Sequence, residues 1–277
     1  CRENRLLELD GFGPASQAAV LEAVRFAARA RERVLIHEAW ASAEELASRF
    51  AGVSGVLRVD VAGEPRRGAE TVGELALVAV AEDGPGATSR LAATVGDGAR
   101  VDGAVVAWRL ESGLRCRLRA SSLAGAGVAL LVETGPPEHL AALAARAAAG
   151  GLTPDAEALR SGAGPRDAAE EAEVYRALGL PWMAPELRDD PVWLEWAAAG
   201  ALPELVAPGD LRGALHNHTT DSDGVASVEE MAAAAARRGW SFLGIADHSP
   251  AAFYAHGVDA ERLRAQGLLI DELNRRG

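Results

Sequence analysis

Hydrophobic and polar positions follow two different periods along the chain, and these periods predict where helices and strands lie. Apolar residues recur at helical spacing from about Ser16, whereas residues 56–61 alternate as in a half-buried strand. Residues 4–30 are expected to form a helix, a tight turn and a second helix. Further helices are predicted over 41–51, 87–95, 137–149, 166–178, 227–238 and 259–275, and strands over 56–61, 75–80, 105–110, 115–119, 211–217 and 241–246.

The pattern near the carboxyl end predicts a β-α-β unit, in which two parallel strands end at the same edge of a sheet. His216 and His218 lie two residues apart at the end of the first strand, so we expect both imidazoles to point to one side. Asp223 follows in the turn, and Asp247 and His248 end the second strand. Three imidazoles and one or two carboxylates, without cysteine, suit a divalent ion such as zinc or manganese.

Composition limits the class of protein. At roughly 100–200 residues per domain, 277 residues allow two domains or several small ones. Hydrophobic residues make up 49% and charged residues 25%, which excludes wholesale disorder. No apolar run is long enough for a membrane span. Cys1 and Cys116 cannot form a disulfide framework or a cysteine zinc site, which favours a reducing, cytoplasmic location.

Charge is distributed unevenly, and every basic residue other than histidine is an arginine. Residues 1–125 hold 16 arginines and 17 acidic residues, whereas residues 126–277 hold 12 arginines and 23 acidic residues. The first part is therefore able to lie near a polyanion. The second part repels one unless cations intervene.

The histidine-rich segments, residues 211–224 and 245–248, resemble the start of the PHP (polymerase and histidinol phosphatase) domain, a distorted β/α barrel that holds up to three metal ions. The resemblance implies that the metal ligands are His216, His218, Asp223 and His248. It implies for Asp247 a catalytic part as a bridging or supporting partner of these ligands. One departure is Ala214, where the family has an Asp that supports the histidines, so we expect weaker orientation rather than loss of binding.

Residues 62–80 resemble the palm of the family X DNA polymerases, where a Gly-Ser-x-Arg-Arg turn precedes Glu-Thr-Val-Gly-Asp-x-Asp. Two Asp at i and i+2 share one face of a strand and bridge two Mg²⁺ ions, and a third Asp comes from a neighbouring strand. Here Glu64 replaces the serine, Glu74 and Ala76 replace the first two Asp, and Arg117 replaces the third, while Arg66 and Arg67 remain. We therefore expect a palm that holds no Mg²⁺ pair and synthesises no DNA.

Two further segments carry the same resemblance. Residues 7–16 are similar to the helix-hairpin-helix of the family's fingers, which implies that Gly11, Gly13 and Ser16 contact a DNA phosphate. The family's lysine after this turn is missing, so a purely structural hairpin is the alternative. Thr134 and Gly135 match the thumb, with Val132 and Glu133 in place of the aromatic pair beside the nucleotide. Residues 171–188 match the connector that precedes the PHP domain.

The resemblance implies a multidomain α/β and α+β fold. The expected parts are helix-hairpin-helix fingers (1–30), a nucleotidyltransferase-type palm of mixed sheet and helices (31–122), a helical and mixed thumb with its connector (123–205), and the incomplete start of a PHP barrel (206–277). We expect the chain to be a piece of a longer protein, because the family's remaining metal ligands would follow Gly277. We expect these 277 residues alone to be inactive.

The function expected from the resemblance is DNA repair by a metal-dependent phosphoesterase of the 3′–5′ exonuclease type. Its expected partners are zinc or manganese ions and gapped or 3′-ended DNA, with no membrane and a monomeric state. Two alternatives remain open. One is a non-catalytic DNA-binding repair module, and the other is a small-molecule phosphoesterase similar to histidinol phosphatases.

Overall fold

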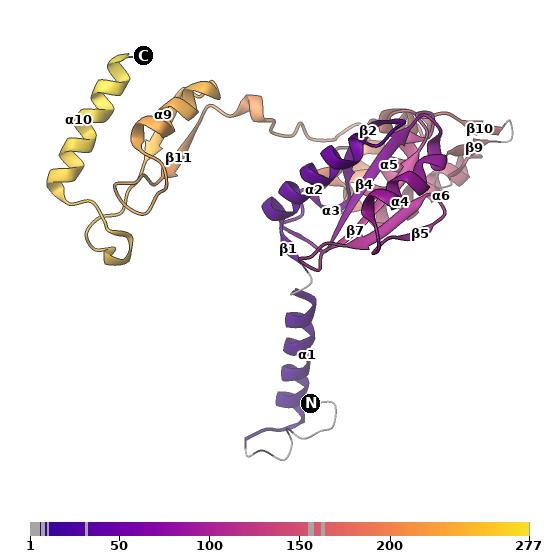
Figure 1. Cartoon of the computed structure of the whole chain (residues 1–277), viewed down its shortest axis with the longest axis horizontal. Helices are drawn as coiled ribbons and strands as arrows, with labels where there is room; N and C mark the ends of the chain where they lie inside the picture. The colour runs from indigo at the N-terminus through magenta and orange to yellow at the C-terminus, as the bar shows by residue number, and fades with distance from the viewer. Residues whose placement is uncertain are drawn as a thin grey trace. The chain divides into compact units, whose positions relative to one another are not determined.

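The computed structural model of the chain describes residues 6, 9, 11–30, 33–154, 158–161 and 164–276. Contacts between residues divide the chain into two units, Cys1–Leu202 and Pro203–Gly277 (Figure 1). The division into four domains expected from the sequence stays a prediction.

The first unit is built on a five-stranded mixed sheet. Its strands lie in the order β2 (Val56–Ala62), β4 (Glu74–Ala81), β7 (Arg115–Ser121), β6 (Val105–Arg109) and β5 (Arg100–Asp102). β4 and β7 are parallel, and the other neighbouring pairs are antiparallel. The four strands predicted between residues 56 and 119 are therefore confirmed, whereas the short edge strand β5 was not predicted.

Helices cover both faces of this sheet because the side chains of β4 alternate between two apolar environments. Leu75 and Leu77 face α2 (Ile36–Ala51) and α4 (Thr88–Val95), where Phe50 and Leu91 are fully buried. Ala76, Val78 and Val80 face α5 (Ala126–Thr134), which contributes Ala126 and Ala129. Alanines on both sides of this second interface allow α5 to lie close to the strand.

A second apolar core gathers the helices that follow the sheet. These are α5, α6 (Pro137–Ala149), α7 (Glu171–Ala177) and α8 (Val192–Ala198), beside the small strands β8 (Thr153–Pro154), β9 (Leu159–Ser161) and β10 (Gly164–Arg166). The prediction for α6 is confirmed, but α7 begins later than residue 166. The reason is that Ala168 exchanges backbone hydrogen bonds with Ala124 and Gly127, which keeps the chain extended before the helix.

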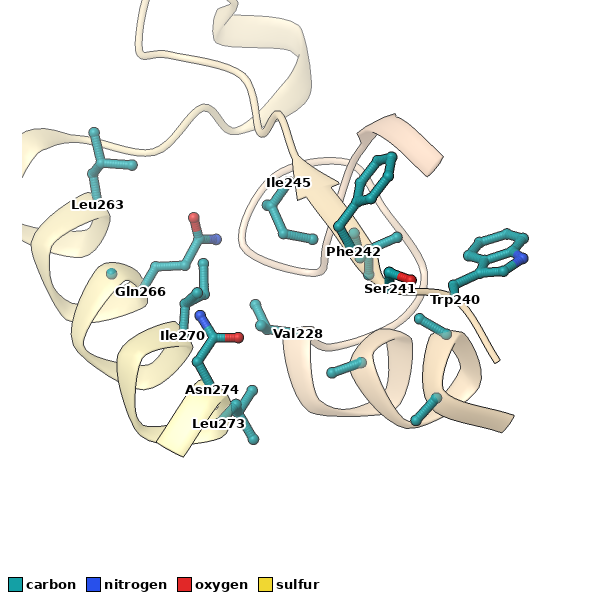
Figure 2. A pocket seen from close by; sticks show the side chains of 15 residues that line it. Val228, Trp240, Ser241, Phe242, Ile245, Leu263, Gln266, Ile270, Leu273 and Asn274 are labelled. Carbon is teal, nitrogen blue, oxygen red and sulfur yellow. The ribbon is translucent and has the colours of Figure 1, made fainter. Parts of the chain in front are cut away.

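The second unit contains the predicted β-α-β arrangement. β11 (Gly213–Asn217) and β12 (Phe242–Ile245) pair in parallel, with α9 (Val228–Arg237) between them in sequence and α10 (Ala260–Arg276) after them. The Ser227 side chain caps α9 by accepting from the Glu230 amide. A pocket of about 580 Å³ lies between α10 and the elements α9 and β12, and Val228, Ile245 and Ile270 are among its apolar lining (Figure 2).

The remaining elements are short or lie before the sheet. α1 spans Pro14–Ala30 and follows Gly11, whose φ of +82° suits a glycine turn. The helix expected before this turn falls mainly outside the described residues, so the helix-hairpin-helix stays a prediction. The other elements are β1 (Val34–Leu35), which pairs with β3 (Thr71–Val72), α3 (Gly63–Arg66), and the 3₁₀ turns η2 (Gly84–Ala87), η3 (Pro185–Leu187), η4 (Pro208–Asp210) and η5 (Phe253–Ala255).

Among the helices that the structure describes, none combines the length and the apolar character needed to cross a bilayer.

Candidate functional site

Two histidines and one aspartate converge where β11 and β12 end. His218 follows β11, His248 follows β12, and Asp223 lies in the loop after β11. The Nδ1 atom of His218 lies 2.8 Å from Oδ1 of Asp223, and Nε2 of His248 lies 3.5 Å from its Oδ2. One donor atom from each residue lies within 4.8 Å of the other two. The parallel strand ends thus bring together three of the four predicted ligands.

His216, the fourth predicted ligand, lies beside this group but outside it. Its ring stacks on that of His218, with centroids 5.3 Å apart and planes 10° apart. The φ of His216 is +61°, and the pairing of β11 with β12 shifts register between Ala214 and Asn217. The two imidazoles therefore lie side by side because the backbone is irregular at His216, and not because alternate residues of a regular strand share a face. A ligand role for His216 stays a prediction.

Asp247 holds the loop that carries Asp223 rather than joining the three converging donors. Its carboxylate accepts hydrogen bonds from the amide and hydroxyl of Thr219 at 2.7 Å each, from Ser222 Oγ at 2.5 Å and from Gln266 Nε2 at 2.7 Å. Burial opposes ionisation, but these bonds outweigh it and lower the pKa of Asp247 to about 2. Its catalytic role stays a prediction, and its contacts are those of a positioning residue.

Close backbone packing also fixes the loop after β11. The Gly224 amide donates to the Thr219 carbonyl at 2.9 Å, and a Cβ atom on Gly224 would overlap the His218 carbonyl. The hydrogen bond from His218 lowers the pKa of Asp223 below its usual value. Gln266 on α10 was not singled out from the sequence, because nothing near it marks it as a partner of Asp247.

The side chains present fit a divalent cation. Two imidazole nitrogens and a carboxylate oxygen form a mixed N/O donor set of the kind that binds zinc or manganese, and no cysteine is involved. Asp223 is charged near neutral pH, as a metal ligand requires, and its contact with His218 lowers its pKa further.

In the sheet of the first unit, the three positions that the resemblance assigns to polymerase carboxylates lie on one face. β4 and β7 pair in register so that Ala76 lies opposite Arg117 and Glu74 opposite Arg115. Gly63, with φ of +68°, approaches this site so closely that a Cβ atom there would lie 3.0 Å from that of Ala76. A methyl group and a guanidinium thus occupy two of the three positions.

A buried glutamate from α5 neutralises this guanidinium. The Glu133 side chain is 1% exposed, and its carboxylate lies 2.8 Å from Arg117 Nε and 2.5 Å from Arg119 Nε. Arg117 Nη2 also donates to Glu133 at 3.0 Å. In the sequence Glu133 appears only as the replacement of an aromatic residue, so its pairing across the sheet was not predicted.

Glu64 likewise forms hydrogen bonds with neighbouring groups of the chain. Its carboxylate accepts from Arg33 Nη2 at 2.7 Å and from the Gly73 amide at 2.6 Å. Burial works against ionisation, but these donors prevail and lower the pKa of Glu64. Glu64 therefore stays anionic beside the turn where a triphosphate would have to bind.

Arg66 and Arg67, the two arginines that remain from the family motif, form hydrogen bonds with residues that come later in the chain. Arg66 donates to both oxygens of Glu171, at 2.9 and 2.7 Å, and to the Thr134 hydroxyl at 3.0 Å. Arg67 donates to the Thr134 carbonyl at 2.6 Å and to Asp189 at 2.8 Å. Gly135 ends α5 by donating to the Leu131 carbonyl.

The predicted DNA contacts at the amino end are accessible. Gly11 and Gly13 have open space where a Cβ atom would lie, and Ser16 is exposed in the first turn of α1. Their role toward DNA stays a prediction.

Comparison with known proteins shows what the chain is similar to. Residues 129–189 match the family model described as DNA polymerase beta thumb. Over 284 residues the chain is 28% identical to a protein named DNA polymerase/3′-5′ exonuclease PolX from Bacillus subtilis (strain 168), and the match covers 99% of this chain and 49% of that relative. The chain therefore spans about half the length of the curated relative it matches. Together these findings support the resemblance seen in the sequence and relate the chain to the family X DNA polymerases.

Proposed function

We propose that the group formed by His218, Asp223 and His248, here called the metal centre, serves phosphoester hydrolysis at DNA 3′ ends. The convergence of its three donors at the ends of two parallel strands is the observation that carries the proposal. The name of the Bacillus subtilis relative, which includes a 3′-5′ exonuclease, supports the reaction type.

Each residue of the metal centre has a distinct part in this proposal. His218 and His248 would hold a zinc or manganese ion through ring nitrogens, and Asp223 would offset its charge. When bound, such an ion supplies a water of lowered pKa and positive charge for the phosphoryl oxygens. Asp247 keeps the loop in place through Thr219 and Ser222, while His216 braces the His218 ring by stacking on it.

We further propose that the palm region (residues 31–122) makes no DNA. Two-metal transfer needs carboxylates that share one face of the sheet, and that face carries Ala76 opposite Arg117. Arg66 and Arg67, which remain from the family's turn, already donate to Glu171, Asp189 and Thr134.

Metal analysis and a hydrolysis assay test the first proposal. We expect the double substitution His218→Ala with His248→Ala to abolish zinc or manganese binding, measured by elemental analysis of the purified chain. Nucleotide release from a 3′-labelled DNA strand is measured on the product of the whole gene, because the chain spans half of its relative. There we expect a loss of at least about 10³-fold, since metal-assisted water activation and charge stabilisation each supply several kcal/mol.

His256→Asn is the matched control. His256 is a histidine of the same unit that lies outside the metal centre, and its φ is +52°. Asparagine tolerates this conformation. Retention of metal and hydrolysis by the double variant would refute the site. If the intact protein neither binds metal nor hydrolyses DNA, the non-catalytic binding module replaces the proposal, and preferential hydrolysis of a small phosphomonoester would favour the histidinol-phosphatase-like alternative.

A further inference from the structure

Two aromatic side chains are exposed beside the metal centre. Phe253 and Tyr254 belong to the 3₁₀ turn η5, which follows β12 and His248. Their exposed fractions are 84% and 70%, which are higher than those of any other Phe, Tyr or Trp in the part of the chain that the structure describes. Phe253 and Tyr254 are here called the aromatic pair.

The aromatic pair contacts a side chain of the metal centre. The Tyr254 ring meets the His248 ring edge to face, with centroids 5.8 Å apart and planes at 64°. The Phe253 ring lies 5.9 Å from the Tyr254 ring, with planes at 81°. His248 in turn meets His218, with ring centroids 4.5 Å apart. The His248 ring therefore links the aromatic pair to the metal centre.

Backbone contacts hold the loop that carries the aromatic pair. The Val258 amide donates to the His248 carbonyl at 2.6 Å, which closes the loop at its base. Gly257 packs so closely on Ser249 that a Cβ atom there would lie 1.9 Å from the Ser249 carbonyl oxygen. Ala255, the last residue of η5, is 1% exposed. The loop thus packs through its backbone and Ala255, while the rings of the aromatic pair face solvent.

Exposed aromatic rings beside a metal centre suit a ligand that carries both a phosphate and a flat ring. Single exposed apolar side chains are common on proteins, but two contiguous rings on a fixed loop form a surface that gains when a ligand covers it. Every nucleobase has a π-face, and stacking of a base on an aromatic side chain raises affinity by about 5- to 150-fold. A nucleotide supplies both groups, whereas inorganic phosphate supplies no ring.

We propose that the aromatic pair stacks against the base of the terminal nucleotide of the strand whose phosphodiester the metal centre hydrolyses. This inference rests on the proposed function and adds two binding residues to that site. Stacking accepts every base, so the pair distinguishes a strand end that carries a base from one that has lost it, and not one base from another. It also favours nucleotides over small phosphate esters without a ring, because such esters leave the pair uncovered.

Hydrolysis by the product of the whole gene, loaded with zinc or manganese, tests this inference. The substrates are two 5′-labelled single strands that differ only at the 3′-terminal nucleotide, which carries either adenine or no base. The test variant is Phe253→Leu with Tyr254→Leu, which keeps apolar side chains and removes their π-faces. Tyr254→Phe is the conservative variant. The control is Trp196→Leu, because Trp196 is a 46% exposed aromatic side chain on α8 of the first unit.

For the unaltered protein we expect kcat/KM to be about 5- to 150-fold higher on the strand with a terminal base than on the abasic strand. The test variant should lose this difference through KM, since stacking stabilises the bound substrate and the transition state alike. It should keep its metal and should hydrolyse the abasic strand as the unaltered protein does. Tyr254→Phe and Trp196→Leu should keep the difference.

An unaltered preference in a metal-loaded test variant would overturn the inference and leave the hydrolytic function standing. An equal loss of preference in the Trp196→Leu control would overturn it as well. If the unaltered protein hydrolyses neither strand, calorimetric titration of the zinc-loaded 277-residue chain with deoxyadenosine monophosphate and with deoxyribose 5-phosphate decides the inference by itself. Tighter binding of the nucleotide, lost in the test variant, supports the aromatic pair although the hydrolytic proposal fails. Equal binding of the two ligands refutes it.

Discussion

Glu171 illustrates how single residues join the palm region to the helices after it. The side chain is 3% exposed and receives hydrogen bonds from Arg66 and from the fully buried Arg188. Desolvation disfavours its charge, yet these bonds dominate and lower the pKa of Glu171. Arg188 also donates to the Met183 carbonyl, so the network fixes both side chains and backbone.

Glu171→Gln is expected to destabilise the chain by about 3–5 kcal/mol, because it leaves two arginines, one of them fully buried, without a countercharge. Urea denaturation followed by circular dichroism measures this loss. Glu195→Gln on the exposed side of α8 is the control, and its effect should stay within about 0.5 kcal/mol. Equal midpoints for the two variants would contradict the assigned role of the network.

His139 makes stability depend on pH. It is 1% exposed, its Nε2 lies 2.8 Å from the Tyr175 hydroxyl, and burial lowers its pKa to about 4. Between that value and about 6.5 the unfolded chain binds a proton that the folded chain does not, so stability falls as the pH falls through this window. The loss reaches about 3 kcal/mol at most.

Comparing urea midpoints at pH 6.5 and pH 4.5 measures this effect. His139→Gln retains a hydrogen-bonding partner for Tyr175 but does not titrate, so its midpoint should change less between the two pH values. If both proteins lose the same stability, other groups are responsible for the pH dependence.

At the scale of elements, regular segments could be predicted from the sequence, and contacts that cross elements could not. Alternation placed β2, β4, β6 and β7, and helical spacing together with Pro137 and Gly150 placed α6. The β-α-β pattern also predicted that His218, Asp223 and His248 lie close together, as they do in the structure. Nothing local in the sequence indicates the φ of His216, which depends on the register shift of β11. Nor does it indicate the pairing of Glu133 with Arg117, which needs α5 to lie on the sheet.

The prediction for DNA synthesis concerns the paired strands β4 and β7. We expect no templated nucleotide incorporation with Mg²⁺ or Mn²⁺, because Ala76 and Arg117 occupy carboxylate positions and Glu133 is already neutralised. A primer-extension gel measures this. Incorporation above that of a no-enzyme control would show that the palm region retains metal-dependent transfer.

At the scale of the whole molecule, the two units differ in which side chains lie beside their carboxylates. The palm region places arginines beside its carboxylates, as Arg33 does for Glu64, so its charges are balanced by the chain itself. In the second unit the partners of Asp223 are the imidazoles of His218 and His248 rather than arginines. Residues 203–277 carry 11 acidic residues and 7 arginines. We therefore expect a cation from solution to bind more strongly in the second unit than in the first.

Adding zinc or manganese should accordingly stabilise the second unit alone. A ligand that binds only the folded form adds stability of RT ln(1 + [L]/Kd), about 2.7 kcal/mol at a hundredfold excess over Kd, and this gain stays in the elements that hold the ligand when units unfold separately. Hydrogen exchange followed by mass spectrometry should therefore slow at residues 213–223 and 242–248 when metal is added, and remain unchanged across β4 and β7. His218→Ala with His248→Ala should remove the protection, whereas His256→Asn should keep it. Slowed exchange in the palm strands would mean that a metal binds there after all.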